Sequence, residues 1–360
     1  MPAAVVKITR CIFLIAGFGF AAWAPLVPFA RARAELSDFS LGLLLLGLGI
    51  GSLISMPLAG AACSRFGCRR TIAVSGVVMA GALPLLASFS RFESLAVALL
   101  LFGIGVGALD VSMNVQAILV ERAFGRPMLS GFHGFFSLGA IAGAGWVVAL
   151  LALDLSPLIA AVSVSVLMLG VLLPALPSML PYGTSREGPL FAIPRGTVLW
   201  LGGICFIAFM AEGAILDWSA VYLQTAHGVN ASWAGIGYAV FSVTMTAGRL
   251  AGDRLVQRLG SRQVVEWGAL LAAVGLFGSV WAPGEGVVLV SYAILGLGLS
   301  NLAPQMFSWV GRQSDMPESA AVPAMNTLGY AGILAGPAMI GFVSHLSGLK
   351  TAFVLVAAAL

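Results

Sequence analysis

Gly60-Ala61-Ala62-Cys63-Ser64-Arg65-Phe66-Gly67-Cys68-Arg69-Arg70 is a short basic segment between two long apolar runs. Its centre, Arg65-Phe66-Gly67-Cys68-Arg69, returns 193 residues later as Arg258-Leu259-Gly260-Ser261-Arg262. The same offset relates Gly103-Ile104-Gly105 to Gly296-Leu297-Gly298. A constant offset in separate regions indicates an internal duplication.

The composition restricts the chain to one class of protein. Only 9% of the 360 residues are charged, 60% are hydrophobic, and the mean hydropathy is +1.03. Soluble domains carry about 25% charged residues, and disordered chains are poor in apolar ones, so both classes are excluded. The apolar runs are too long for the strands of a membrane β-barrel. The sequence therefore predicts an all-α polytopic membrane protein.

The length accommodates about 12 spans of roughly 20 residues each. The last apolar run is too short to cross a membrane. The runs are 8–30, 39–62, 71–90, 94–120, 129–152, 157–178, 197–223, 231–255, 264–283, 286–311, 318–346 and 349–360.

The repeat divides these spans into two six-helix bundles, 1–178 and 197–360, joined by a Pro/Gly-rich linker at 179–196. Trp23 and Trp218 match at an offset of 195 in the first helix of each half. An even number of spans gives both halves one orientation, and such parallel repeats place a substrate site between the halves near the bilayer midplane. Because Leu360 corresponds to Leu167 in the middle of the sixth span, we expect the twelfth helix to be truncated.

The basic residues are distributed unevenly over the two sides of the predicted membrane. With a cytoplasmic N-terminus, 14 of the 18 lie on the cytoplasmic side, as the positive-inside rule requires. The pI of 9.1 therefore follows from topology, and no nucleic-acid partner is expected. The four on the outer side are Arg31, Arg33, Arg91 and Lys350, and those inside are Lys7, Arg10, Arg65, Arg69, Arg70, Arg122, Arg126, Arg186, Arg195, Arg249, Arg254, Arg258, Arg262 and Arg312.

Neither a metal nor a cofactor is indicated. The three histidines are dispersed, and the four cysteines form no Cys-x-x-Cys pair, so we interpret them as small packing side chains. The glycine clusters lie in apolar spans without the Lys-Ser/Thr of a P-loop, and they fit close helix packing instead. We therefore expect no enzyme activity.

The basic segment at 60–70 resembles the characteristic loop of the major facilitator superfamily (MFS). That loop has an Asp where this chain has Ser64, and the second copy carries Asp253 close to Arg249. Twelve spans, the 6+6 repeat and the central linker agree with the family, and 110–116, 130–134 and 212–218 resemble its YbjJ-like bacterial branch. The resemblance implies the MFS fold, and a cytoplasmic gate at Gly60, Arg65, Gly67, Arg69, Arg70, Arg249, Asp253, Arg258, Gly260 and Arg262.

Four ionisable residues inside spans are candidates for proton coupling: Asp110, His133, Glu212 and Asp217. Spans 1, 4, 7 and 10 line the central cavity in the family. Asp110 lies roughly 15 Å from the inner end of its span, as either a proton carrier or a structural carboxylate. Glu212 and Asp217 are about 140° apart around one helix, so both cannot face one cavity, and Glu212 is favoured. His133 is either a relay or a packing residue.

The remaining polar and aromatic candidates for the cavity lining suit a neutral polar solute such as a sugar. Packing is the alternative for each Trp. We also expect Pro25, Pro28, Pro304 and Pro337 to kink their helices. The candidate cavity residues are Trp23, Asn114, Trp218, Asn301, Gln305, Asn326 and Tyr330.

The sequence predicts a secondary active transporter with alternating access, and proton symport of a small polar solute is favoured. A proton-coupled drug or metabolite efflux antiporter is the alternative, and a non-transporting membrane sensor is the alternative of another class. The partners expected are the lipid bilayer, a small-molecule substrate and protons. We expect a multi-pass monomer in a bacterial inner membrane, with a cytoplasmic N-terminus.

Overall fold

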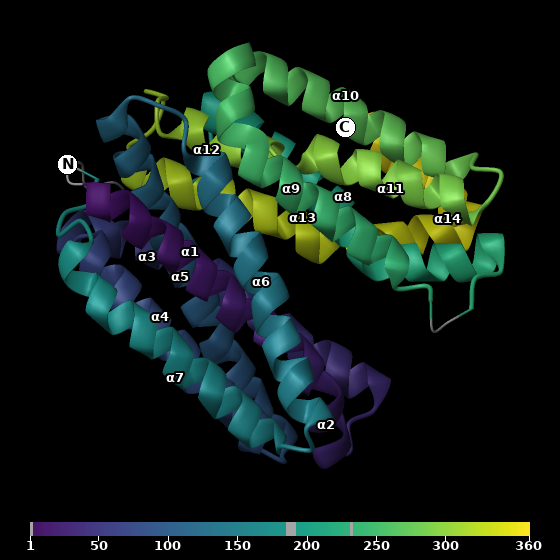
Figure 1. Cartoon of the computed structure of the whole chain (residues 1–360), viewed down its shortest axis with the longest axis horizontal. Coiled ribbons are helices and arrows are strands. Elements are labelled where there is room, and N and C mark those ends of the chain that lie inside the picture. Colours follow the sequence, from purple (N-terminus) through teal and green to yellow (C-terminus); the bar gives the residue numbers. More distant parts are fainter. Residues whose placement is uncertain (1–2, 185–191, 231–232) are drawn as a thin grey trace. The chain divides into compact units, whose positions relative to one another are not determined.

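The computed structural model describes residues 3–184, 192–230 and 233–360, and every regular element among them is a helix (Figure 1). The helices of the first part are α1 (Ala3–Ala22), η1 (Ala24–Leu26), α2 (Val27–Arg33), α3 (Asp38–Phe66), α4 (Cys68–Ser88), α5 (Phe92–Phe124), α6 (Leu129–Ala152), α7 (Pro157–Ala175) and η2 (Leu176–Ser178). Those of the second are α8 (Thr197–His227), α9 (Ile236–Leu259), α10 (Ser261–Val280), α11 (Glu285–Leu299), α12 (Leu302–Val310), α13 (Glu318–Ser347) and α14 (Leu349–Ala359).

Ten helical segments of the described chain are long and apolar enough to cross a membrane, which confirms the predicted class. The predicted eighth span is α9, which is not among the ten and carries Arg249, Asp253, Arg254 and Arg258. The last predicted run is the short helix α14.

Two spans are interrupted close to prolines, as the sequence predicted. The first breaks at the 3-10 turn η1, which contains Pro25, and continues as α2. The tenth breaks between α11 and α12 at Ser300 and Asn301, four and three residues before Pro304. Proline lacks the N–H that would bond to the carbonyl four residues earlier, so the helix opens there. By contrast, α13 continues past Pro337.

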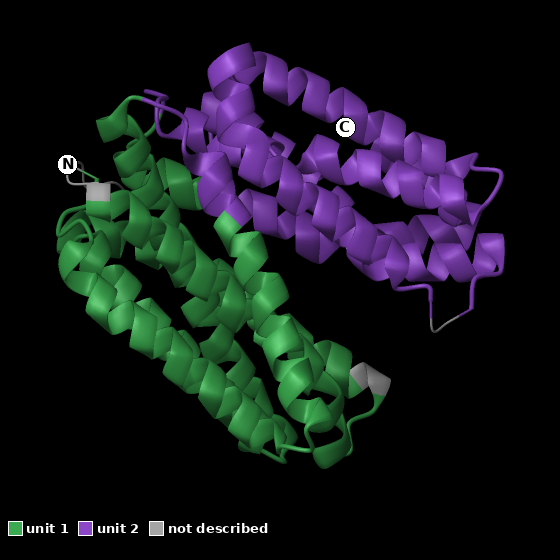
Figure 2. Ribbon diagram, viewed as in Figure 1, with its two compact units in different colours: residues 1–125, 135–193, 316–324 green, residues 126–134, 194–315, 325–360 purple. Residues whose placement is uncertain are grey.

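The chain forms two compact units (Figure 2). Unit 1 comprises 1–125, 135–193 and 316–324, and unit 2 comprises 126–134, 194–315 and 325–360. Each unit contains one predicted half, apart from two short exchanged segments. The first turn of α6 belongs to unit 2, and the first turns of α13 belong to unit 1.

The duplication is visible in the close helix contacts. A Cβ at Gly103 would meet the Leu48 carbonyl oxygen, and one at Gly296 would meet that of Phe241, so both glycine and partner are shifted by 193 positions. In the same way, Gly105 approaches the backbone nitrogen of Met79, and Gly298 approaches that of Ala272. Both halves therefore pack their fourth span against the second and third through the same small residues.

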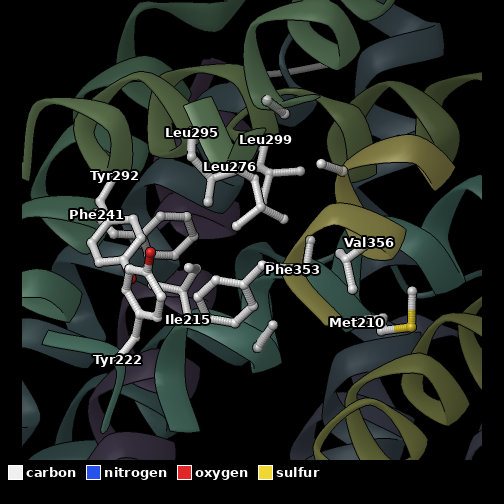
Figure 3. Packing of buried hydrophobic residues seen from close by; sticks show 14 of the residues in the cluster. Met210, Ile215, Tyr222, Phe241, Leu276, Tyr292, Leu295, Leu299, Phe353 and Val356 are labelled. Carbon is white, nitrogen blue, oxygen red and sulfur yellow. The ribbon is translucent and has the colours of Figure 1, made fainter. Parts of the chain in front are cut away.

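The core of unit 2 includes a cluster of aromatic side chains (Figure 3). Tyr222 of α8 lies 5.3 Å from Phe353 of α14, measured between ring centroids, and its hydroxyl donates to the Ser279 carbonyl at 3.1 Å. Phe241 of α9 and Tyr292 of α11 are also fully buried in this cluster. Through Phe353, the short helix α14 is an integral part of the core of unit 2.

Candidate functional site

A charged pair joins two helices of unit 2, α8 and α9. The Arg249 guanidinium of α9 is 3.7 Å from the Glu212 carboxylate of α8, and only 8% of the Arg249 side chain is exposed. A buried arginine requires a counter-charge, because an unpaired buried charge is very costly. The predicted gate residue Arg249 is therefore the partner of the predicted proton-coupling residue Glu212.

Arg249 also contacts the break in span 10. Its Nε donates to the Ser300 carbonyl oxygen at 3.4 Å. Because Pro304 has no N–H, that carbonyl lacks its helical donor, and the guanidinium provides one. Arg249 thus connects α8, α9 and the α11–α12 break through one side chain.

The Asp253 carboxylate lies four residues after Arg249 on α9 and binds the start of α6. Asp253 Oδ1 accepts a hydrogen bond from the Gly131 backbone nitrogen at 3.0 Å. Gly131 is in the first turn of α6, where N–H groups have no helical acceptor and the helix dipole favours an anion. A Cβ at Gly131 would collide with this carboxylate, so the contact requires glycine.

Asn301 and Gln305 lie on one face of span 10, as predicted, but both amides bind protein groups. Asn301 Nδ2 donates to the Gly248 carbonyl at 3.1 Å. Gln305 Nε2 donates to Ser130 Oγ at 3.3 Å, and Gln305 Oε1 accepts from Ser261 Oγ at 2.5 Å. Both side chains are buried. These contacts join α12 to α9, α6 and α10.

The other candidates on α6, α8 and α13 are placed as follows. The His133 ring packs on Phe307 with centroids 5.5 Å apart. Asp217 is exposed, whereas Asn326 is buried. The Tyr330 ring meets Phe209 edge-on, with centroids 6.1 Å apart.

In unit 1, Asp110 and Asn114 are linked along one face of α5. Asn114 is fully buried, and its Nδ2 donates to the Asp110 carbonyl oxygen at 2.9 Å and to Asp110 Oδ1 at 3.4 Å. A second polar contact, which the sequence did not reveal, joins α5 to α1. Gln116 Nε2 donates to Thr9 Oγ1 at 3.1 Å, and both residues are fully buried.

Two tryptophans at equivalent positions of the repeat have unused hydrogen-bond donors. Trp23 is 5% exposed, and its indole Nε1 has no acceptor among the described residues. The Trp218 Nε1 is also buried without an acceptor in the described part of the chain. A buried donor without a partner is costly, so each requires an explanation such as a ligand or water.

The first copy of the basic loop holds the end of span 6. Ser64, in the position of the family's Asp, donates to the Ala61 carbonyl of its own helix at 2.9 Å. Arg69 binds the Met179 carbonyl at 2.8 Å, and Gly67 has a φ of +84° that side chains rarely adopt. Cys63 and Cys68, on either side of this turn, are both buried free cysteines.

Other residues of the predicted gate lie in the second turn or on exposed surface. Gly260 repeats the turn with a φ of +86°, and Arg262 pairs with Glu266 on an exposed face. Arg65 lies over the Phe66 ring, and Arg258 is exposed.

The first turns of α13 rest on α3 and α5 in unit 1. A Cβ at Gly60 would collide with Pro323 and with the Ser319 carbonyl. An ion pair that the sequence did not reveal, Arg122 to Glu318 at 3.2 Å, lies beside this contact.

The family model of the Major Facilitator Superfamily matches residues 11–337. The chain belongs to this superfamily. It is 50% identical to an uncharacterized MFS-type transporter of Yersinia pestis, over 97% of this chain and 91% of that protein. It is therefore a multi-pass membrane protein of a bacterial transporter family and not an enzyme.

Solved structures show the same fold at low identity. The E. coli fucose:proton symporter FucP matches with a TM-score of 0.82 and 18% identity, over 98% of this chain and 95% of that one. The human organic anion transporter MFSD10 matches with a TM-score of 0.78 and 16% identity, over 100% of this chain and 98% of that one. These likenesses establish the fold alone.

Proposed function

We propose that this MFS transporter carries a small polar solute in symport with protons by alternating access. The observation that carries the proposal is the Glu212–Arg249 pair on α8 and α9. A carboxylate in a membrane-crossing helix is energetically costly, so such a residue is a candidate for function. This carboxylate can be neutralised by a single proton.

The proton step acts through Arg249. Protonation of Glu212 removes the counter-charge of Arg249, which then depends on its other acceptors. Asp253 lies one helical turn away on α9, and its carboxylate holds the first turn of α6 through Gly131. Loading a proton on Glu212 would draw Arg249 towards Asp253 and weaken that hold.

The solute class is inferred from the donors that have no protein acceptor. Trp23 and Trp218 each offer one buried indole N–H, at equivalent places in the two halves. A neutral solute with hydroxyl groups, such as a sugar, supplies acceptors for such donors and stacks on aromatic faces. The fucose:proton symporter, which has the same fold, is compatible with this pairing of solute and ion.

We also place the N-terminus in the cytoplasm, because 14 of the 18 basic residues then lie on the cytoplasmic side. This orientation puts the basic turns at Gly67 and Gly260 on the cytoplasmic face.

The proposal is tested in proteoliposomes. A thermal-shift screen of the purified protein against neutral sugars and polyols, organic acids and cationic drugs first selects a solute. Uptake of that labelled solute is then driven by an imposed pH gradient. Glu212→Gln should abolish proton-driven accumulation and retain solute exchange, because the amide cannot carry the proton. The control is Glu266→Gln, which removes an exposed carboxylate of α10.

Three results would contradict the proposal. Full proton-driven accumulation in Glu212→Gln would show that Glu212 is not the coupling group. Outward movement of solute against an inward proton flow would establish antiport. A stabilising hit among cationic drugs alone would refute the polar solute.

A further inference from the structure

A groove of about 440 Å³ runs along the surface of unit 1, and neither member of the charged pair lines it. Its walls are α3 and α4, and its floor is α5. Both walls pack tightly on α5, through Gly103 against Leu48 and Gly105 against Met79, while α3 and α4 touch each other little. The groove therefore follows from how the three helices pack.

The surface of the groove is hydrocarbon. Leu58, Phe66 and Val74 line it with 46%, 49% and 65% of their surfaces exposed. Three hydroxyls also line it, on Ser55, Thr71 and Ser75, and each donates to a carbonyl of its own helix. Because these donors are already used, the walls favour an apolar occupant.

The end of the groove next to the Gly67 turn is basic. Arg70, in the first turn of α4, lines it and is exposed. The two other arginines of this turn contact protein groups, since Arg65 lies over the Phe66 ring and Arg69 binds the Met179 carbonyl. Arg70 makes no hydrogen bond or ion pair with any described residue, and no acidic residue lines the groove. Its charge therefore remains available to an anion.

We infer that this groove binds one anionic phospholipid, with an acyl chain between α3 and α4 and the phosphate on Arg70. The dimensions agree. The α3 wall runs from Ser55 to Phe66, and 11 steps of 1.5 Å give roughly 16 Å. One leaflet of the hydrocarbon core is about 15 Å thick. Basic pockets between spans are known to hold anionic head groups.

The head-group contact is tested on the purified full chain in detergent. Native mass spectrometry measures binding of palmitoyl-oleoyl phosphatidylglycerol, and of phosphatidylcholine with the same acyl chains. Arg70→Gln should weaken phosphatidylglycerol binding about fivefold, the value of one basic residue beside an anionic lipid, and leave phosphatidylcholine unchanged. The control is Arg126→Gln, which removes an exposed arginine that lies outside the groove.

The acyl-chain contact is tested by filling the groove. Val74→Trp places a bulky ring over it, and Val97→Trp adds the same ring to another exposed valine, on α5. The Val74 variant should lose phosphatidylglycerol binding at least as strongly as Arg70→Gln, whereas the Val97 variant should bind like wild type. Thermal unfolding verifies that each variant is folded. If Val74→Trp does not fold, Arg70→Gln, which changes an exposed side chain, tests the inference by itself.

Either of two results would overturn the inference. Equal losses in Arg70→Gln and Arg126→Gln would show a diffuse attraction to basic surface. Wild-type binding in a folded Val74→Trp variant would show that the lipid lies elsewhere.

Discussion

The Glu212–Arg249 pair should show strong energetic coupling, which a double-mutant cycle measures. At 3.7 Å, two unit charges attract by about 4–5 kcal/mol at an effective dielectric constant near 20. Because 24% of the Glu212 side chain is exposed, water reduces this value, and we expect a coupling of about 2–3 kcal/mol. The pair is therefore worth far more than an exposed salt bridge.

The cycle uses the repeat to choose its replacements. The first-half counterpart of Arg249 is Met56, which is fully buried, so Arg249→Met substitutes a side chain that this fold already accommodates. Glu212→Ala alone should cost about 3–5 kcal/mol, because it leaves Arg249 buried without its counter-charge. The double variant should recover most of that loss, since replacing both members of a buried pair is often nearly neutral.

The assay is equilibrium unfolding of the four proteins in mixed micelles. Arg262 and Glu266 form the control cycle: their atoms are closer, at 2.6 Å, but both side chains are exposed. Coupling there should be too small to measure. Additive losses at Glu212 and Arg249 would refute the argument, as would a control cycle of equal size.

Three further predictions concern other parts of the chain. Gly252→Val should cost about 1–3 kcal/mol in unfolding free energy, because its Cβ would collide with Asn301 and Ser130, and a melt within error of wild type would contradict this. Hydrogen bonds from Thr197 lower the pKa of Asp315, so this carboxylate stabilises the start of α8 above the usual Asp range and loses the effect as pH falls through the lowered pKa. Asp315→Asn should therefore melt below wild type at neutral pH but not in acid, and a constant difference would show that ionisation is not involved. A single cysteine at Arg258 in a cysteine-free background should resist an impermeant maleimide in intact cells while one at Glu285 reacts, and the opposite pattern would invert the proposed orientation.

The sequence predicted those features that depend on local chemistry and on the repeat. Long apolar runs identify spans because lipid forces each to satisfy its own backbone. The Gly67 and Gly260 turns recur at one offset because only glycine readily adopts their φ values of +84° and +86°. The break before Pro304 was predictable for a similar reason, since proline removes one N–H wherever it lies.

The partners of polar residues could not be predicted, because they depend on how helices are rotated against one another. Asn301 and Gln305 were correctly placed on one face, but the sequence cannot say whether that face meets solute or the helices that it binds. Glu212 and Arg249 were each identified, but not as a pair. The repeat did contain a signal, because their counterparts Gly17 and Met56 are both uncharged. Charges that appear in only one half are candidates to pair with each other.

The repeat also shows which first-half position corresponds to Asp253. At the offset of 193 its counterpart is Gly60, and Ser64 corresponds to Gln257, so Asp253 lies one helical turn before the family's Asp. Both equivalent positions contact the first turns of a helix, Gly60 those of α13 and Asp253 that of α6. In unit 1 the contact is made by close packing at Gly60, whereas in unit 2 it is made by a charge-assisted hydrogen bond from Gly131 to Asp253.

This difference makes the two contacts unequal in strength. A carboxylate bound to a free N–H at a helix start is worth about 1.5–3 kcal/mol, from its charge and the helix dipole. The ion pair beside Gly60 leaves 49% of the Arg122 side chain exposed, so water and salt screen it. The first turns of α13 should therefore leave unit 1 more readily than the first turn of α6 leaves unit 2. The stronger contact is also the one that Arg249, and hence a proton on Glu212, can weaken.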